Sequence, residues 1–232
     1  MKTFRTAATT ALAVLAALAG APALADPSPA VTAAAAPAAV SAAAPDQVVR
    51  DATERVRALI TKNHKKYKVD SKAFYDMVDA EIVPHFDLPF IAQQILARNW
   101  RGASPEQRER FQAAFKNMLI HSYADALLQY YDSVKAEWEP LRRSDGTDSV
   151  QVKCKLDRKN AQPLELGFAM HQKDGDWKIY DIVVENISLV TSFRGQITSE
   201  IRNSNLDAVI QRLENGGSVT PAGAPGSAPA KQ

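Results

Sequence analysis

The sequence predicts one α+β domain, in which helices cover one face of a four-stranded antiparallel meander sheet. Two observations lead to this fold class. Apolar residues recur every three or four positions over residues 45–132, and every second position over residues 133–189. Helical spacing then returns over residues 190–213. Strands joined by short loops favour an antiparallel meander, because parallel strands need long crossover connections.

Three short or medium helices are predicted first. Pro45 suits the first turn of a helix, and the basic stretch 62–68 interrupts the apolar pattern that follows it. Asp70 or Ser71 can cap a second helix. A third helix is expected over about residues 87–99.

The strongest helix start in the chain is Ser104-Pro105-Glu106-Gln107. Ser104 caps the helix, Pro105 fills its first position, and Gln107 completes a capping box. No breaker follows until after Tyr131, so the helix is predicted to be about 40 Å long.

Four strands are predicted after this long helix, with apolar and polar side chains alternating along the first three. The strands are expected over residues 134–138, 150–156, 164–170 and 177–189. The last one carries apolar groups on both faces, so part of it should be covered on both sides. Hairpin turns are expected at Asp145-Gly146 and at residues 173–176.

The N-terminus has the pattern of a secretory signal. Lys2 and Arg5 precede an apolar run of about 14 residues, and Ala23-Leu24-Ala25 matches a cleavage site. The run is too short for a transmembrane helix, which needs about 20 residues. We therefore expect residues 1–25 to be a cleaved signal peptide and the mature protein to work outside the cytoplasm.

Composition sets the boundaries of the domain. Residues 26–45 form an Ala/Pro-rich linker and residues 216–232 a Gly/Ser/Pro-rich tail, both expected to be disordered. The folded domain is then 46–215. Without Lys2 and Arg5 the chain has 26 basic and 26 acidic residues, so it has no bulk attraction for nucleic acid or for an anionic membrane. Any such contact must be a local patch, and no nucleic-acid partner is expected.

Motifs for catalysis are missing from the sequence. The four histidines lack metal-ligand spacing, there is no G-x-S-x-G or phosphate-binding loop, and Cys154 lies inside a predicted strand. We expect no enzyme activity, no catalytic residues, no metal and no cofactor. The basic run Lys62–Lys68 is either a solvated helix end or a contact for anionic lipid or a partner.

Three segments resemble the MlaC family, also called the toluene-tolerance family. They are Trp100–Arg108, which reads W-R-G-A-S-P-E-Q-R, Trp177–Ile182, which reads W-K-I-Y-D-I, and Ser188–Gln196, which reads S-L-V-T-S-F-R-G-Q. Their order and spacing agree with the family over about residues 47–213. Phe193 departs from it, because a tyrosine is usual there, and Asn186 lies near a usual glycine.

The resemblance implies a periplasmic phospholipid carrier with a lipid pocket between sheet and helices. The implied partners are phospholipid, an outer-membrane lipoprotein–porin complex, and the MCE-domain subunit of an inner-membrane ABC transporter. This system maintains outer-membrane lipid asymmetry. We expect a monomer. A carrier of hopanoids or other lipids, or a ligand-free periplasmic adaptor with a solid core, remains an alternative.

The candidate lipid-binding residues lie on the apolar strand face and on the inner line of the helices. The strand candidates are Val150, Val152, Leu166, Phe168, Met170, Ile182 and Val184. The helix candidates are Ile95, Leu119, Tyr123 and Leu127. Each of them could instead belong to an ordinary hydrophobic core. Trp100, Trp177 and Arg194 are expected to be structural.

Overall fold

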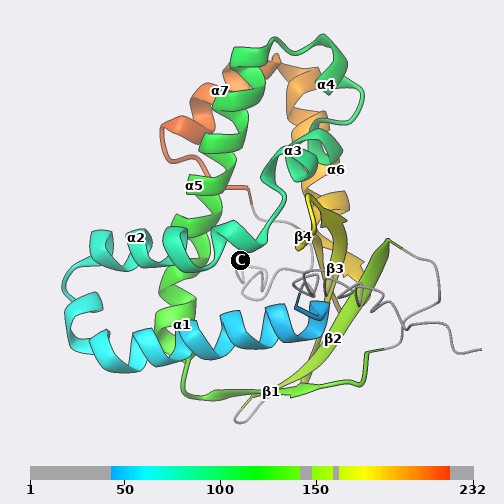
Figure 1. Cartoon of the computed structure of the whole chain (residues 1–232). Coiled ribbons are helices and arrows are strands. Elements are labelled where there is room, and N and C mark those ends of the chain that lie inside the picture. Colours follow the sequence, from blue (N-terminus) through cyan, green and yellow to red (C-terminus); the bar gives the residue numbers. More distant parts are fainter. Residues whose placement is uncertain (1–42, 142–147, 159–161, 220–232) are drawn as a thin grey trace, which may run out of the picture. The chain divides into compact units, whose positions relative to one another are not determined.

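The structure is a computed structural model that describes residues 43–141, 148–158 and 162–219, all within one compact unit. The predicted signal peptide, nearly all of the predicted linker and the predicted turn at Asp145-Gly146 lie outside the described residues. Within those ranges, helices precede and follow an antiparallel sheet (Figure 1). None of the described helices is both long enough and apolar enough to cross a membrane.

The elements follow the predicted order. The helices are α1 Pro45–Tyr67, α2 Ser71–Glu81, the 3-10 helix η1 Val83–His85, α3 Leu88–Leu96, α4 Asn99–Gly102, α5 Pro105–Tyr130, α6 Leu189–Asn203 and α7 Leu206–Glu214. The strands are β1 Val134–Trp138, β2 Ser149–Arg158, β3 Leu164–Lys173, β4 Asp176–Val184 and β5 Ile187–Ser188.

Helix α1 is longer than expected, because the predicted break at residues 62–68 is wrong. The helix continues to Tyr67, which is buried. Lysine is a good helix former, and cations near a helix C-terminus interact favourably with the helix dipole, so the basic run extends α1. Asp70 then caps α2 by accepting a hydrogen bond from the Ala73 amide at 2.9 Å.

The capping box at the start of α5 is confirmed. The Gln107 amide donates to Ser104 Oγ at 3.1 Å, and the Ser104 amide donates to Gln107 Oε1 at 2.9 Å. Both bonds satisfy amides that the helix itself leaves without acceptors.

Ser104→Ala should lower the free energy of unfolding by about 1 kcal/mol, because one capping acceptor is lost. Urea denaturation measures this change. Ser122→Ala is the matched control, since Ser122 lies within α5 and alanine is the better helix former. Equal midpoints for the two variants would contradict a stabilising role for the cap.

The sheet has five described strands in the order β1-β2-β3-β4-β5, and each adjacent pair is antiparallel. The prediction of four strands is therefore wrong by one. The predicted last strand, 177–189, is divided at Glu185 and Asn186, whose φ angles are 47° and 64°. Two consecutive positive φ angles turn the chain back as a tight hairpin, so Ile187 pairs with Val184.

A bulge in β4 explains its unusual apolar spacing. Met170 pairs with Ile179 but Ala169 pairs with Asp181, so Tyr180 is the extra residue. Ile182 pairs with Phe168, two residues from Met170. Because residues two apart on a strand share a face, the bulge places Ile179 and Ile182 on the same inner face despite their separation of three.

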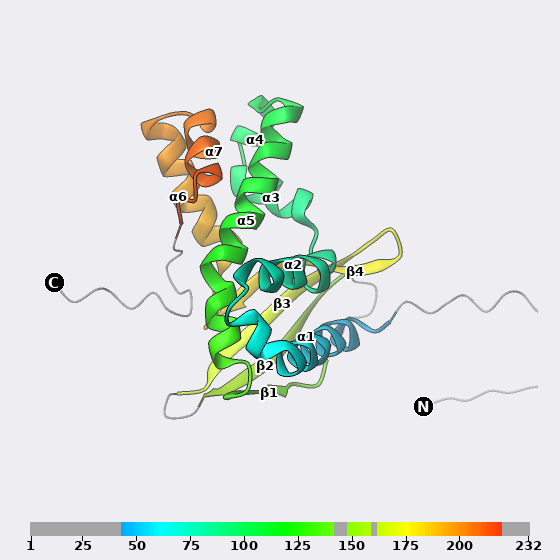
Figure 2. The same ribbon diagram turned by 90° about the vertical axis from the view of Figure 1, so that its left-hand side faces the viewer.

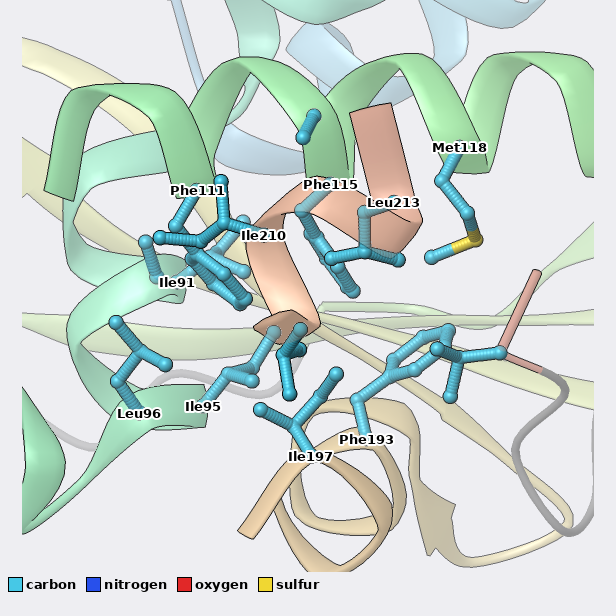
Figure 3. Close-up of a cluster of buried hydrophobic side chains, with 14 of the residues drawn as sticks. Ile91, Ile95, Leu96, Phe111, Phe115, Met118, Phe193, Ile197, Ile210 and Leu213 are labelled. Carbon is cyan, nitrogen blue, oxygen red and sulfur yellow. The ribbon is translucent and has the colours of Figure 1, made fainter. Parts of the chain in front are cut away.

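Helices pack around the sheet in two groups. Helix α1 covers the inner face, where Val49 packs with Val152 and Met170 (Figures 1 and 2). Helices α3, α5, α6 and α7 form a second core beside one end of the sheet (Figures 1 and 2). The side chains labelled in Figure 3 converge there, namely Ile91, Ile95, Leu96, Phe111, Phe115, Met118, Phe193, Ile197, Ile210 and Leu213.

Packing extends beyond residue 215, the predicted end of the domain. Val219 is buried in the helical core, and the Gly217 amide donates to the Arg212 carbonyl at 2.9 Å. The rest of the predicted tail, residues 220–232, lies outside the described residues.

Candidate functional site

A cavity of about 360 Å³ lies between α5, the inner face of β3 and β4, and the start of α6. Its walls are almost entirely apolar. Helix α5 contributes Leu119, Tyr123 and Leu127, which follow one another at intervals of four and therefore share a helix face. The strands contribute Leu166 and Ile182.

A second cavity of about 420 Å³ lies between α1, the end of α5 and the inner face of the sheet. It shares Ile82, Phe86, Leu127 and Ile182 with the first cavity, so the two adjoin. Its walls are more polar than those of the first cavity, since Arg57 and other polar groups contribute to them. Both volumes fall within the range of about 300–1,000 Å³ that is usual for small-molecule sites.

The structure brings most of the predicted site residues together. Seven of the eleven line the first cavity: Ile95, Leu119, Tyr123, Leu127, Leu166, Ile182 and Val184. Phe168 lines the second cavity.

Val150, Val152 and Met170 line neither cavity. They pack with Val49 and Trp177 in the core that α1 covers. Apolar alternation marks the inner face of a strand, but it does not say which part of that face a helix will cover.

Much of the cavity wall comes from the segment between α2 and α3, which sequence reasoning did not select. Ile82, Val83, Phe86 and Leu88 all line the first cavity. The sequence signal that could have identified them is a group of apolar residues beside Pro84 that does not follow helical spacing. Their position depends on a long-range contact, because Phe86 forms a parallel bridge with Ile179 of β4.

Asp87 links the segment around Phe86 to strand β3. Its side chain is 4% exposed and accepts from Lys173 Nζ at 2.8 Å and from the Phe90 amide at 3.2 Å, while His171 Nε2 lies 3.0 Å from its other oxygen. Burial alone would raise the pKa of this carboxyl, but the bonds from Lys173, Phe90 and His171 together lower it below its ordinary value. The Asp87 amide also donates to the Ile179 carbonyl at 2.9 Å.

Two arginines of the family-like segments make local structural contacts. Arg194 of α6 donates to the carbonyl and side chain of Gln94 at 2.7 and 3.1 Å, which ties α6 to α3. Arg108 lies over the Trp100 ring at 4.7 Å and donates to the Trp100 carbonyl. These side chains position helices around the first cavity.

The charged side chains at the first cavity, Lys116 and Asp181, are already paired. Lys116 Nζ lies 2.8 Å from both carboxylate oxygens of Asp79. Asp181 accepts from Ser188 Oγ at 2.5 Å and from the Val190 amide at 3.0 Å, which anchors the start of α6. Burial raises the pKa of the Tyr123 hydroxyl. The cavity therefore offers an apolar ligand an apolar wall whose charged side chains are paired.

Residues 50–215 match the MlaC protein family. The chain belongs to the MlaC family. It is 31% identical over 166 residues to the toluene tolerance protein Ttg2D of Pseudomonas putida, covering 70% of this chain and 76% of that protein.

Two further similar proteins carry informative names. The Haemophilus influenzae protein named intermembrane phospholipid transport system binding protein MlaC is 22% identical over 174 residues, covering 74% of this chain and 81% of its own. A phospholipid-binding protein from Ralstonia solanacearum, solved in complex with a phospholipid, has 26% identity and a TM-score of 0.69. That match covers 75% of this chain and 97% of the solved one.

Proposed function

We propose that this protein is a periplasmic phospholipid carrier that holds acyl chains in the two adjoining apolar cavities. One observation carries the proposal. The apolar cavity between α5, β3 and β4 occurs in a chain that is 26% identical to a protein solved with a bound phospholipid. Membership of the MlaC family and the names of the relatives support it.

The energetics suit a carrier. Each methylene that leaves water gains about 0.8 kcal/mol, so two acyl chains with roughly 30 methylenes would gain about 24 kcal/mol. That exceeds the practical ceiling of about 18–21 kcal/mol for non-covalent affinity. A bilayer offers the lipid nearly the same gain, so the net preference between membrane and carrier is small. A dry cavity therefore lets lipid leave as well as enter.

The carrier would exchange phospholipid between an outer-membrane lipoprotein–porin complex and an inner-membrane ABC transporter with an MCE-domain subunit. The finer points of this route rest on the family and on the name of the Haemophilus influenzae relative. Apolar cavity walls with paired charged side chains need no catalytic group for such exchange.

Gentle purification followed by native mass spectrometry should show the protein with phospholipid bound. Organic extraction should release that lipid, and the emptied protein should take up labelled phospholipid from liposomes. A lipid-free protein that also takes up no lipid would contradict the carrier and favour a ligand-free adaptor. An extracted hopanoid would support carriage of a different lipid class.

A further inference from the structure

The hairpin between α1 and α2 ends in a cluster of exposed lysines. Lys62, Lys65, Lys66 and Lys68 are all exposed, and none of their side-chain amines makes an ion pair or hydrogen bond within the described residues. Residues 62–76 hold five lysines and two aspartates, a net charge of +3. This local charge lies on a chain that is nearly neutral as a whole. We call residues 62–69 the basic tip.

Two acidic groups lie close to the basic tip and lower its net charge, but they are too few to cancel it. Asp70 uses its carboxylate to cap α2, accepting from the Ala73 amide at 2.9 Å. Asp76 pairs with Lys72 at 2.7 Å, one turn further along α2. The positive field of the tip is therefore available to an anionic surface.

An apolar side chain stands beside these charges. Val69 is 87% exposed, the highest exposure among the large apolar residues that the structure describes. Lysines around an exposed valine resemble the composition of segments that rest on membranes, where cations meet head groups and apolar groups enter the interface.

The hairpin of α1 and α2 is held by buried aromatic side chains, and it also contributes residues to the cavity walls. Tyr67 and Phe74 pack at its base with tilted rings whose centroids are 5.2 Å apart, and both are buried. Figures 1 and 2 show α1 and α2 lying together as a hairpin. Residues farther from the tip line the cavities, with Val78 of α2 on the first and Val56 of α1 on the second.

We propose that the basic tip docks this protein on the surface of an anionic phospholipid bilayer. Docking brings α2, which lines the first cavity, and α1, which lines the second, next to the lipid source. Attraction between lysines and anionic head groups is screened by salt, so docking is reversible and sensitive to ionic strength. The proposal concerns the tip alone and does not require the cavities to hold lipid.

Flotation with vesicles tests the proposal. The purified protein should float with vesicles of phosphatidylglycerol and phosphatidylcholine at low salt, and should stay behind with pure phosphatidylcholine vesicles. Raising the salt to about 0.5 M should release it. The double variant Lys65→Gln/Lys66→Gln should bind about 25-fold more weakly, because each lysine near such a surface contributes about fivefold.

The matched control is Lys153→Gln/Lys155→Gln, since both lysines are exposed on β2, away from the inner face. It should bind as the unmodified protein does. No binding to anionic vesicles, equal binding to both vesicle types, or equal loss in the two double variants would overturn the proposal. Native mass spectrometry of Lys65→Gln/Lys66→Gln should show unchanged bound lipid, which separates failure of docking from failure of the cavity.

Discussion

Ile182→Asp should weaken phospholipid binding at least about a hundredfold, so that uptake falls to background. Ile182 lines both cavities, so the new carboxylate would face the acyl chains wherever they lie. An unpaired charge against methylenes costs several kcal/mol, and each 1.4 kcal/mol weakens binding tenfold. Uptake of labelled phospholipid from liposomes measures the effect.

The neighbouring residue provides the control. Val183 lies on the same strand, faces the opposite side of the sheet and lines neither cavity. Val183→Asp should therefore keep lipid uptake. If both variants fold and both take up lipid normally, the cavity is not the binding site.

A second variant avoids any charge. Leu119→Trp adds volume from α5 into the first cavity and keeps the wall apolar. It should reduce the amount of bound lipid while the protein stays folded by circular dichroism. Unchanged lipid in Leu119→Trp together with loss in Ile182→Asp would place the acyl chains in the second cavity.

Asp87→Ala should lower the free energy of unfolding by about 2–3 kcal/mol at neutral pH, because a helix cap and hydrogen bonds to a charged group are lost. The substitution removes the cap of α3 and leaves Lys173 and His171 without their shared carboxylate. Urea denaturation measures the loss. Asp76→Ala is the control, because the Asp76 carboxylate pairs with Lys72 on an exposed helix surface, and it should change stability little.

The difference in the free energy of unfolding between the unmodified protein and Asp87→Ala should decrease at acidic pH. The folded pKa of Asp87 lies below its ordinary value of 3.8, so its carboxylate stabilises the fold above pH 3.8. That contribution should shrink as the pH falls from 3.8 through the lower folded pKa. A difference that stayed constant down to pH 2 would mean that the charge of Asp87 contributes nothing.

Asp87 also connects stability with the cavity. Phe86 and Leu88, its two neighbours in sequence, both line the first cavity. Releasing Asp87 should loosen that wall, so we expect Asp87→Ala to bind less lipid than Asp76→Ala at equal protein concentration.

Local signals were enough for most of the secondary structure. Ser104 and Gln107 predicted the start of α5, because a capping box involves only two residues that are three apart in the sequence. The extension of α1 through Lys65 and Lys66 was missed because charged residues interrupt an apolar pattern without interrupting a helix. The turn at Glu185 and Asn186 was missed because neither residue is glycine, although both adopt positive φ.

For the cavity, the sequence by itself determined which side chains face inward and that α5 presents Leu119, Tyr123 and Leu127 along one line. Only the tertiary structure decided which inward groups meet a cavity and which meet another helix. Val152 and Leu166 carry the same apolar signal, but α1 covers the first and leaves the second on a cavity wall. That outcome depends on where α1 and the segment around Phe86 dock, and such contacts join residues far apart in the chain. The periodicity of apolar residues indicates which face of a single helix or strand is buried. It holds no information about the space left between two such elements.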